Sequence, residues 1–531
     1  MIVSFFKLVV ARGARGGRWL ALPALSLLGA CGTAPSPGTA EPAFAADSAT
    51  VRVAPNPAYA RRGWWWQHLW GRHYRALWAT PVAAPVLRLG AAGLQPQRLG
   101  GSFQTSVLHL RAADGSSWVL RSVDKDLSRG VDAGWLDQAI APVLRDQTCA
   151  APPYGALVAA QLAQAAGIEH PHPRLVYLLP DTALGALAAR LPPALYLLEK
   201  RPAGPAAGVV GSGAMLAQLL GSHRARLAAR AYLRARLLDL LVGDWSRRAD
   251  QWRWQVRPAA TSPVFEPIPR DRDQAFFRFD DGWLTRGISW VRPRYQTFSA
   301  HLTPADVRPL TVTARALDHT ALAWLPEAAF AAEADSLVRR LPDAVLSQAL
   351  AAAPAEARPL LRGYLLAALR DRRAALPAVA RRFYQVLQEE PVLTGTDAAE
   401  RFELLAAGPG CLRLRAWARR PPRPDSLLGE RVFDVRRTTR LTVYGLGGND
   451  VFELRGSLQP GFGVHLHGGA GRNQFRQQEP GQAQGPGLTI YTTPADLVQV
   501  SAGVRRRPGP AEAATPPWLA RTYRLGTGAR N

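Results

Sequence analysis

Two acidic segments near the middle of the chain lie close together and are typical of a single site. The first, LLDLLVGDWSRRADQWRW, covers residues 237–254, and the second, FEPIPRDRDQAFFRFDDG, covers residues 265–282. Both contain loops rich in Asp, whose carboxylates can bind divalent cations or transfer protons. The pattern therefore indicates chemistry that uses carboxylates, at a place where the two loops meet.

The residues around these loops predict the elements that position them. An apolar helix precedes the first loop, and residues 251–256 and 264–268 have the character of a β-hairpin with a turn of Pro, Ala, Thr and Ser. The order is therefore helix, acidic loop, hairpin, acidic loop. Protein-kinase-like folds use this order to place a catalytic loop and a metal-binding loop at one cleft.

A β-rich stretch nearer the N-terminus predicts groups for the other side of such a cleft. Gly100 and Gly101 precede a strand that returns through a hairpin turn at Asp114-Gly115. The returning strand brings Arg121 and, just beyond it, Lys125. A glycine-containing turn, a strand pair and a basic residue form the phosphate-covering arrangement of a kinase N-lobe.

These segments resemble the atypical kinase-like families typified by CotH and HipA, in which an Asp is followed five residues later by an Asn, then a hairpin and a second acidic motif. The chain also resembles a group of bacterial envelope proteins with the pattern GDWDRHxDxW followed by PRDRDQAF. Some members are joined to an outer-membrane surface-antigen barrel or to a calcineurin-like phosphoesterase. The resemblance covers residues 71–475. It implies an α+β fold: a kinase-like two-lobe core with a helical extension, followed by a small β-rich domain.

The resemblance also implies roles for individual residues. Asp271 or Asp273 would hold Mg²⁺ or Mn²⁺ between phosphate groups, with a further ligand at Gln251, where the family has Asn. Lys125, with Arg121 as the second choice, would contact the phosphates. The remaining ligand-binding positions are Gly100 and Gly101 in the turn, and Glu199 and Lys200 at the hinge between the lobes.

One position departs from the family pattern in a way that bears on catalysis. The expected acidic residue of the catalytic loop is Ser246, and a serine hydroxyl is a poor base at neutral pH unless another base activates it. Asp244 is retained, but two residues along the loop its carboxylate is expected to point elsewhere. Two readings follow: an atypical phosphotransferase, or a binding protein without activity. A third is structural, with Asp271 and Asp273 forming ion pairs with Arg270 and Arg272.

The start of the chain predicts a lipid anchor in the cell envelope. Residues 1–30 carry a basic region and a short apolar run, and they end in Leu28-Gly29-Ala30-Cys31, which resembles a bacterial lipobox. This implies cleavage before Cys31 and lipid attachment to its thiol, with residues 31–62 as a flexible tether. Gly32 does not provide the Asp signal for inner-membrane retention, so the outer membrane is the expected location. An outer-membrane barrel protein is a candidate partner.

The formal net charge of +25 on 531 residues is almost entirely due to Arg, and Lys7, Lys125 and Lys200 are the only lysines. The basic residues are spread along the chain, and no nucleic-acid-binding signature accompanies them. We therefore expect no nucleic-acid partner. A non-catalytic envelope scaffold is the alternative function.

The remaining segments predict the domain organisation. We expect an N-lobe-like region over residues 63–200, a helical C-lobe-like region over 201–390, a β-rich domain over 391–500 and a disordered tail over 501–531. Trp64 to Trp66 are expected to cover the core rather than a membrane interface. Turns at 445–452 and 468–475 resemble the Gly/Asp-rich calcium repeats of RTX proteins, but two imperfect copies do not make a stacked calcium roll, so we expect structural turns without calcium at residues 445–452. Pairing of Cys149 with Cys411 stays open.

Overall fold

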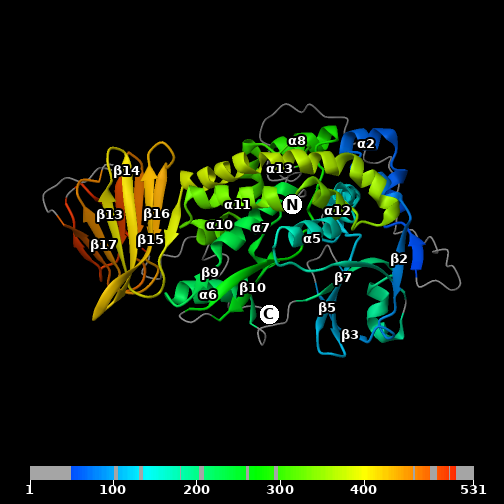
Figure 1. Ribbon diagram of the computed structural model, residues 1–531, viewed down its shortest axis with the longest axis horizontal. Helices are drawn as coiled ribbons and strands as arrows, with labels where there is room; N and C mark the ends of the chain where they lie inside the picture. Colours follow the sequence, from blue (N-terminus) through cyan, green and yellow to red (C-terminus); the bar gives the residue numbers. More distant parts are fainter. Residues whose placement is uncertain are drawn as a thin grey trace.

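The computed structural model describes residues 50–100, 106–130, 135–179, 181–201, 208–258, 262–291, 297–458, 461–478, 487–501 and 503–509. The fold is α+β: a β-sheet lobe and a mainly helical lobe are followed by a β-rich unit at the far end of the molecule (Figure 1). The expected signal peptide and Cys31 lie outside the described residues. The expected flexible tether covered residues 31–62. The described fold, however, already begins at Thr50, the first residue of a β-strand.

The first lobe is built on a seven-stranded sheet with the strand order β1–β2–β6–β7–β5–β4–β3. Its strands are β1 (Thr50–Val53), β2 (Val82–Leu87), β3 (Leu94–Gly100), β4 (Val107–Ala112), β5 (Ser117–Ser122), β6 (Arg174–Leu178) and β7 (Ala194–Lys200). The five strands from β3 to β6 in this order are antiparallel neighbours. The turn at Gly115 joins β4 and β5, and its φ of 77° is the left-handed conformation that glycine adopts without strain. This confirms the predicted hairpin.

Helices connect β5 to β6 and cover the sheet. They include α4 (Trp135–Asp146) and α5 (Gly155–Ala165), which are separated by a short segment that contains Pro152-Pro153. The smaller helices α2 (Trp64–Trp70) and α3 (Arg75–Ala79) precede the sheet's main strands. The prediction that Trp64 to Trp66 cover the core is wrong for Trp64 and Trp65, which are exposed.

The second lobe is helical and contains one small sheet. Its helices are α6 (Ser212–Gly221), α7 (Ala229–Val242), α8 (Trp283–Val291), α9 (Val307–Thr311), α10 (Arg315–Leu322), α11 (Glu327–Arg340), α12 (Asp343–Leu350) and α13 (Arg358–Glu389). The small sheet has the order β8 (Val209–Gly211), β10 (Trp252–Arg257), β11 (Val264–Pro269) and β9 (Arg226–Leu227). The predicted hairpin is therefore β10–β11. Strand β9 lies between α6 and α7, the apolar helix that precedes the first acidic loop.

Helix α7 is the central element of this lobe because most of its residues from Tyr232 to Val242 are buried. It ends at Gly243, whose left-handed φ of 67° stops the helix and releases the chain into the first acidic loop. Trp245, Trp252 and Trp254 are also buried, as expected of core residues. The loop is thus held between the buried helix and the buried hairpin.

The β-rich unit is a coil of strands that alternate between two sheets. One sheet has the order β12–β16–β18–β20–β22, and the other has the order β15–β14–β13–β17–β19–β21. Their strands are β12 (Val392–Thr394), β13 (Glu400–Ala406), β14 (Cys411–Arg420), β15 (Arg423–Asp434), β16 (Arg440–Tyr444), β17 (Val451–Arg455), β18 (Gly463–His467), β19 (Gln474–Gln477), β20 (Leu488–Thr492), β21 (Leu497–Gln499) and β22 (Arg505–Pro508). All neighbouring strands are parallel except at the β13–β14–β15 hairpins.

The coils stack with a sequence period of 23 residues. The Asp450 amide donates to the Asn473 side chain, and the Asn473 amide donates to Asp496, each across 23 residues. Phe402, Phe452 and Phe475 form a ladder of stacked rings in the core of the unit. The two Gly/Asp turns therefore belong to a stacked coil of strands, and the prediction that they do not bind calcium stays a prediction. The predicted disordered tail is wrong at residues 505–508, which form β22.

The β-rich unit is attached to the helical lobe through buried polar contacts. Arg431, on β15, donates to the carbonyls of Ala323 and Leu325 and to the side chains of Tyr384 and Gln388. Cys149 and Cys411 are both free thiols. Among the described residues, no helix has the length and apolar character needed to cross a membrane.

Candidate functional site

The two lobes meet at a narrow cleft where cations from the first lobe contact carboxylates from the second. Arg121, on β5, and Lys125, just after it, approach the loop that follows β11. Arg121 Nη1 pairs with Asp271 and lies 3.3 Å from Asp273 Oδ2. Lys125 Nζ pairs with the same Asp273 oxygen. The four residues that the sequence assigned to phosphate and metal binding are therefore in contact.

The cleft in this state is too small for a phosphorylated metabolite. Its cavity volume is about 50 Å³, and Arg121, Lys125, Thr148, Asp273 and Phe277 are among its lining residues. Pockets that bind small molecules usually have volumes of roughly 300–1,000 Å³. A ligand could enter only if the lobes separated and the cross-lobe ion pairs opened.

The backbone holds the acidic loop in an unusual conformation. Asp271 has a φ of 60°, in the left-handed region that non-glycine residues rarely adopt. The loop is fixed on both sides: the Arg270 amide donates to the Gln251 carbonyl at 2.9 Å, and the Phe276 amide donates to the Val242 carbonyl at 2.8 Å. Conformations of this kind persist where the surrounding structure enforces them, and they concentrate at functional sites.

The environment gives the two carboxyl groups of this loop different pKa values. Burial raises the pKa of Asp273 to about 6, and the charge of Asp271 adds to the rise, against the opposing effect of Arg121. Burial acts in the same direction on Asp271, but the positive charge of Arg121 and Lys125 outweighs it and holds the pKa of Asp271 below its ordinary value. Two carboxyls that interact so closely attract a cation between or beside them.

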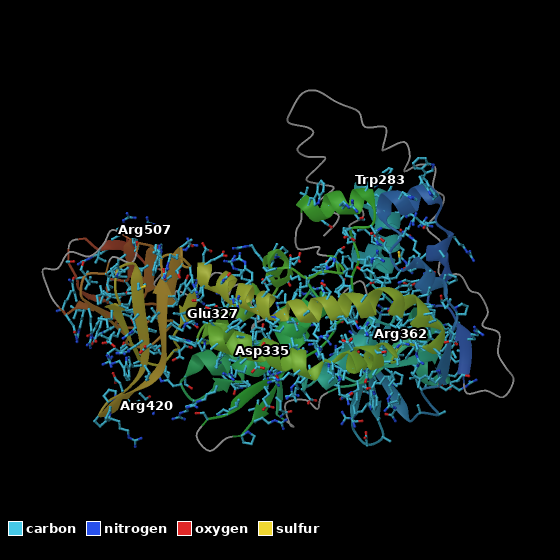
Figure 2. The ribbon with its side chains drawn as sticks, turned by 45° about the horizontal axis from the view of Figure 1, so that its top comes forward. Trp283, Glu327, Asp335, Arg362, Arg420 and Arg507 are labelled. Atoms are coloured by element: carbon cyan, nitrogen blue, oxygen red, sulfur yellow. The ribbon has the colours of Figure 1, made fainter. Side chains whose placement is uncertain are left out.

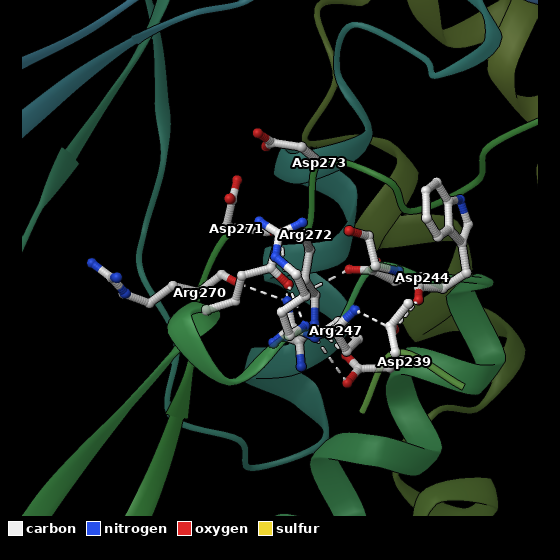
Figure 3. Close-up of polar contacts among 12 residues, drawn as sticks. Asp239, Asp244, Arg247, Arg270, Asp271, Arg272 and Asp273 are labelled. Carbon is white, nitrogen blue, oxygen red and sulfur yellow. Dashed lines mark hydrogen bonds and ion pairs between the residues drawn. The ribbon is translucent and has the colours of Figure 1, made fainter. Parts of the chain in front are cut away.

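Beneath the cleft lies a buried network centred on Asp239 of α7. Its carboxylate accepts hydrogen bonds from Arg236 at 3.0 Å, Arg247 at 3.2 Å and Arg272 at 3.0 Å. The side chain of Arg247 also donates to the Arg270 carbonyl at 2.6 Å. Figure 3 shows Asp271 and Asp273 pointing away from this network. The network thus fixes the backbones of both acidic loops while leaving the two carboxylates to the cleft.

This network corrects the structural reading of the acidic loop. Arg272 pairs with Asp239 and not with the neighbouring aspartates. Asp271 and Asp273 take their cationic partners from the other lobe instead. Sequence reasoning missed Asp239 and Arg247, although a charged residue inside an apolar helix such as LLDLLV is a signal of a buried pair.

Asp244 and Ser246 lie on the loop that leaves α7. Both are buried, and the Ser246 amide donates to Asp244 Oδ1 at 3.1 Å. The other Asp244 oxygen accepts no hydrogen bond within the described residues and lies 3.6 Å from Arg247 Nη1. Burial, with the charge of Asp239 as a further cause, raises the pKa of Asp244 to about 7. Its side chain has no exposed surface, so it faces the protein and not an acceptor hydroxyl.

The remaining predicted residues lie at different places. Glu199, on β7, is in the cleft and pairs with Arg121 at 2.6 Å. The Gln251 side chain accepts the Arg248 amide at 3.2 Å, and no hydrogen bond joins it to Asp271 or Asp273 in the described part of the chain.

Two of the predicted ligand-binding positions lie away from the contacts described so far. Lys200 is exposed at the end of β7 and lies 5.9 Å from the Trp118 ring. Gly100 ends β3, and Gly101 lies outside the described residues.

The fit of a divalent cation rests on Asp271 and Asp273. Within the described residues, no group of three His, Cys, Asp or Glu side chains is arranged to hold a metal ion. Mg²⁺ is commonly held by one or two carboxylates, with substrate phosphates and water completing its coordination. The donor set therefore fits a cation that binds together with a phosphorylated ligand, and does not fit a protein-only metal site.

Comparison with known proteins gives distant likenesses to kinases. No protein-family model and no curated protein matches the chain. The proinflammatory kinase CtkA of Helicobacter pylori is similar at 9% identity over 57% of this chain and 99% of its own, with a TM-score of 0.31. The toxin–antitoxin protein HipA of Shewanella oneidensis is similar at 10% identity over 55% of this chain and 66% of its own, with a TM-score of 0.24.

A third likeness is to the Rio2 kinase of Chaetomium thermophilum, at 13% identity over 39% of this chain and 57% of its own, with a TM-score of 0.20. We take no residue role from these distant likenesses. The kinase-like two-lobe arrangement follows from the chain's own topology. Antiparallel strands, with Arg121 on the third and Lys125 just after it, are followed by a buried helix, a loop, a hairpin and an acidic loop.

Proposed function

We propose that the cleft binds a phosphorylated ligand together with Mg²⁺ or Mn²⁺. The observation that supports this most strongly is the pairing of Arg121 and Lys125 with Asp271 and Asp273 across the lobes. In the closed state each set neutralises the other. When a ligand enters, its phosphate oxygens replace the carboxylates around the two cations, and a divalent cation replaces the side-chain cations beside the carboxylates.

The geometry favours binding over phosphoryl transfer. The position expected to hold a catalytic carboxylate is Ser246, and the nearest carboxylate on the loop, Asp244, is fully buried against Arg247. Catalysis by kinases needs a residue that orients the acceptor hydroxyl. Neither residue is placed to do so, and we therefore propose a binding protein of kinase-like architecture. The alternative is an atypical phosphotransferase, in which the same cleft also transfers a phosphoryl group.

We further propose that the protein is a lipid-anchored component of the cell envelope, in the outer membrane. The lipobox-like sequence ending in Cys31 supports this, as does the resemblance to envelope proteins with the PRDRDQAF motif. The alternative, a scaffold that holds an envelope partner such as an outer-membrane barrel, uses the same location without requiring a ligand. The cross-lobe charges favour the ligand-binding form.

A thermal-shift assay tests the proposal directly. Nucleotides and sugar phosphates are added with and without Mg²⁺ or Mn²⁺, because a ligand that binds the folded state raises the melting temperature. We expect a metal-dependent rise for the unchanged chain and none for Asp271→Ala with Asp273→Ala. Asp335→Ala, at an exposed position of α11, is the matched control and should behave like the unchanged chain. A rise that survives the double substitution would contradict the proposed site.

A further inference from the structure

One edge of the molecule exposes an unusual cluster of tryptophans. Trp64, Trp65, Trp283 and Trp290 have exposed fractions of 58%, 66%, 62% and 79%. Leu284 and Val291 beside them are also exposed. They come from two helices, α2 and α8, that are far apart in sequence but adjacent in the fold, with the rings of His68 and Trp283 6.4 Å apart. We call these six side chains the tryptophan patch.

Helix α8 presents its apolar stripe outward. Trp283 and Trp290 are seven residues apart in the sequence, as are Leu284 and Val291, so each pair lies on one side of the helix. The buried residues Thr285 and Ile288 lie on the opposite side. A surface helix normally turns its apolar stripe to the core. Here the stripe faces solvent, which marks an interaction surface rather than chance exposure.

Fixed contacts hold α2 of the first lobe and α8 of the second lobe together. A Cβ atom at Gly282, just before α8, would lie 2.4 Å from the Gly71 amide nitrogen, so the chain segments after α2 and before α8 touch through their backbones. His73 Nδ1 lies 2.7 Å from Asp281 Oδ1 across the same junction. Trp66 of α2 donates to the buried Asp146 at 2.7 Å. The exposed rings therefore belong to a fixed platform.

The charge around the patch is positive. Arg61, Arg72 and Arg286 are exposed on the two helices or beside them. The nearby carboxylates lie beside basic side chains: Asp146 pairs with Arg75 and Arg62, and Asp281 lies 3.9 Å from Arg278. Asp280, just before α8 in the described part of the chain, is half-buried. Arginines next to exposed tryptophans are typical of surfaces that meet anionic lipid headgroups.

We propose that the tryptophan patch docks on an anionic lipid surface. Tryptophan rings partition into the headgroup region of a bilayer, and an outward apolar stripe with a basic rim binds in the plane of that interface. Figure 2 shows Trp283 on the upper edge of the molecule, in the half away from Arg420 and Arg507 of the β-rich unit. This surface is separate from the cleft and goes beyond the proposed ligand binding.

The lipid anchor proposed above, on which this step rests, supports a lipid surface over other occupants. The described fold begins at Thr50, shortly before α2, and an extended chain from Cys31 to Thr50 spans at most about 65 Å. A lipid on Cys31 would therefore keep the tryptophan patch within reach of the membrane. The anchor would raise the effective concentration of the patch at the membrane, and the patch would determine which face of the protein contacts the bilayer.

Fluorescence quenching by lipids with brominated acyl chains tests the docking. The full chain is reconstituted in vesicles containing phosphatidylglycerol, and quenching of tryptophan emission is compared with a variant carrying Trp64→Phe, Trp65→Phe, Trp283→Phe and Trp290→Phe. We expect strong quenching for the unchanged chain and loss of more than half of it in the variant. Quenching that does not change between the two would overturn the proposal.

The controls separate docking from other causes. Trp324→Phe with Trp417→Phe removes two rings outside the patch and should leave the quenched emission unchanged. Replacing Arg61, Arg72 and Arg286 by Glu should reduce quenching in phosphatidylglycerol vesicles, whereas Arg420→Glu on the β-rich unit should not. If the patch is instead covered by a second copy of the chain, the protein is a dimer before vesicles are added and its patch is not quenched. That result would also overturn the proposal.

Discussion

At the scale of single residues, the cleft depends on charges that change partners. Lys125 and Arg121 hold Asp273 and Asp271 in the closed state, and the same cations are the groups that would bind phosphate oxygens. Closure thus keeps buried charges paired when no ligand is present. The energetic cost of separating these pairs is recovered only by a ligand that brings both an anion and a metal ion.

Lys125→Ala is expected to weaken binding of a phosphorylated ligand by about 10- to 100-fold, since a hydrogen bond to a charged group contributes roughly 1.5–3 kcal/mol. The measurement is isothermal titration with the ligand identified by thermal shift, in the presence of Mg²⁺. Lys200→Ala is the matched control, because Lys200 is exposed at the end of β7. Equal losses for the two variants would contradict the placement of Lys125 at the phosphate.

The site was predictable from the sequence to the extent that its residues lie on strongly patterned segments. The hairpin turn at Gly115 and the hairpin after residue 251 bring Arg121 and Asp271 to one cleft. Their roles in binding phosphate and metal stay predictions. Gln251 was less predictable, since its side chain turns back to the Arg248 amide. The direction of a side chain in a loop depends on local hydrogen bonds that residue spacing does not reveal.

At the scale of elements, the stacked coils of the β-rich unit contain a proton-dependent pair. The Glu400 amide donates to Asp450 Oδ1 at 2.8 Å, and the side chains of these two acids interact. In the next coil the equivalent residue is Asn473, whose Nδ2 donates to Asp496 at 3.0 Å. One ladder position therefore has a carboxyl where its neighbour has an amide.

Asp450→Asn is expected to remove a pH dependence of stability. Burial, followed by the charge of Glu400, raises the pKa of Asp450 from 3.8 to about 9 in the folded chain. The folded state therefore retains a proton that the unfolded state releases, and stability falls as the pH rises from about 4 to about 9. The amide has no such proton, so the variant is more stable at pH 9, by roughly 1–3 kcal/mol.

Urea unfolding of the Asp450→Asn chain between pH 5 and pH 9 provides the measurement. The gap between the variant and the unchanged chain should widen as the pH rises, and Asp335→Asn should show no such trend. A constant gap across this range would mean that Asp450 is already ionised in the folded chain.

The third coil escaped sequence analysis because its residues differ from the first two. The turn before β21 contains Thr493-Pro494-Ala495-Asp496, with none of the glycines of the turns at residues 445–452 and 468–475. The sequence does have a period of 23 residues, but the two turns were recognised by their Gly and Asp residues, which the third turn largely lacks. The physical repeat is an apolar side chain stacked in each coil, and the ladder of Phe452 and Phe475 shows that it tolerates changes in the turn.

At the scale of the whole molecule, the two lobes and the β-rich unit were predictable from patterns of composition. Alternating strands, apolar helices and the change near residue 391 predicted an α+β fold, and the structure confirms it. The limits of the units were less predictable. The strand that begins at Thr50 belongs to the fold because it pairs with β2, and β22 belongs to it because it pairs with β20. Pairing between strands that are distant in the sequence is not visible in a local segment.

The contact between the helical lobe and the β-rich unit predicts that they unfold together. Arg431 is 5% exposed and donates four hydrogen bonds across this contact. Arg431→Met should lower the free energy of unfolding by about 3 kcal/mol, because buried acceptors lose a charged donor. Arg413→Met, at a more exposed position of β14, should change it by less than about 0.5 kcal/mol.

Urea unfolding followed by circular dichroism and by tryptophan fluorescence measures both effects. Coincident transitions that shift together in Arg431→Met are expected for one cooperative body. Two separate transitions, of which Arg431→Met moves only one, would show that the β-rich unit is stable by itself.

We propose that Asp271 and Asp273 hold a divalent cation beside a phosphorylated ligand bound by Arg121 and Lys125. Anomalous scattering from crystals grown with Mn²⁺ and the ligand found by thermal shift tests it most directly. We expect a manganese peak within about 2.2 Å of an oxygen of Asp271 or Asp273, with the ligand's phosphate beside Lys125. A peak elsewhere, or none at saturating Mn²⁺ with Lys125 still paired to Asp273, would contradict it.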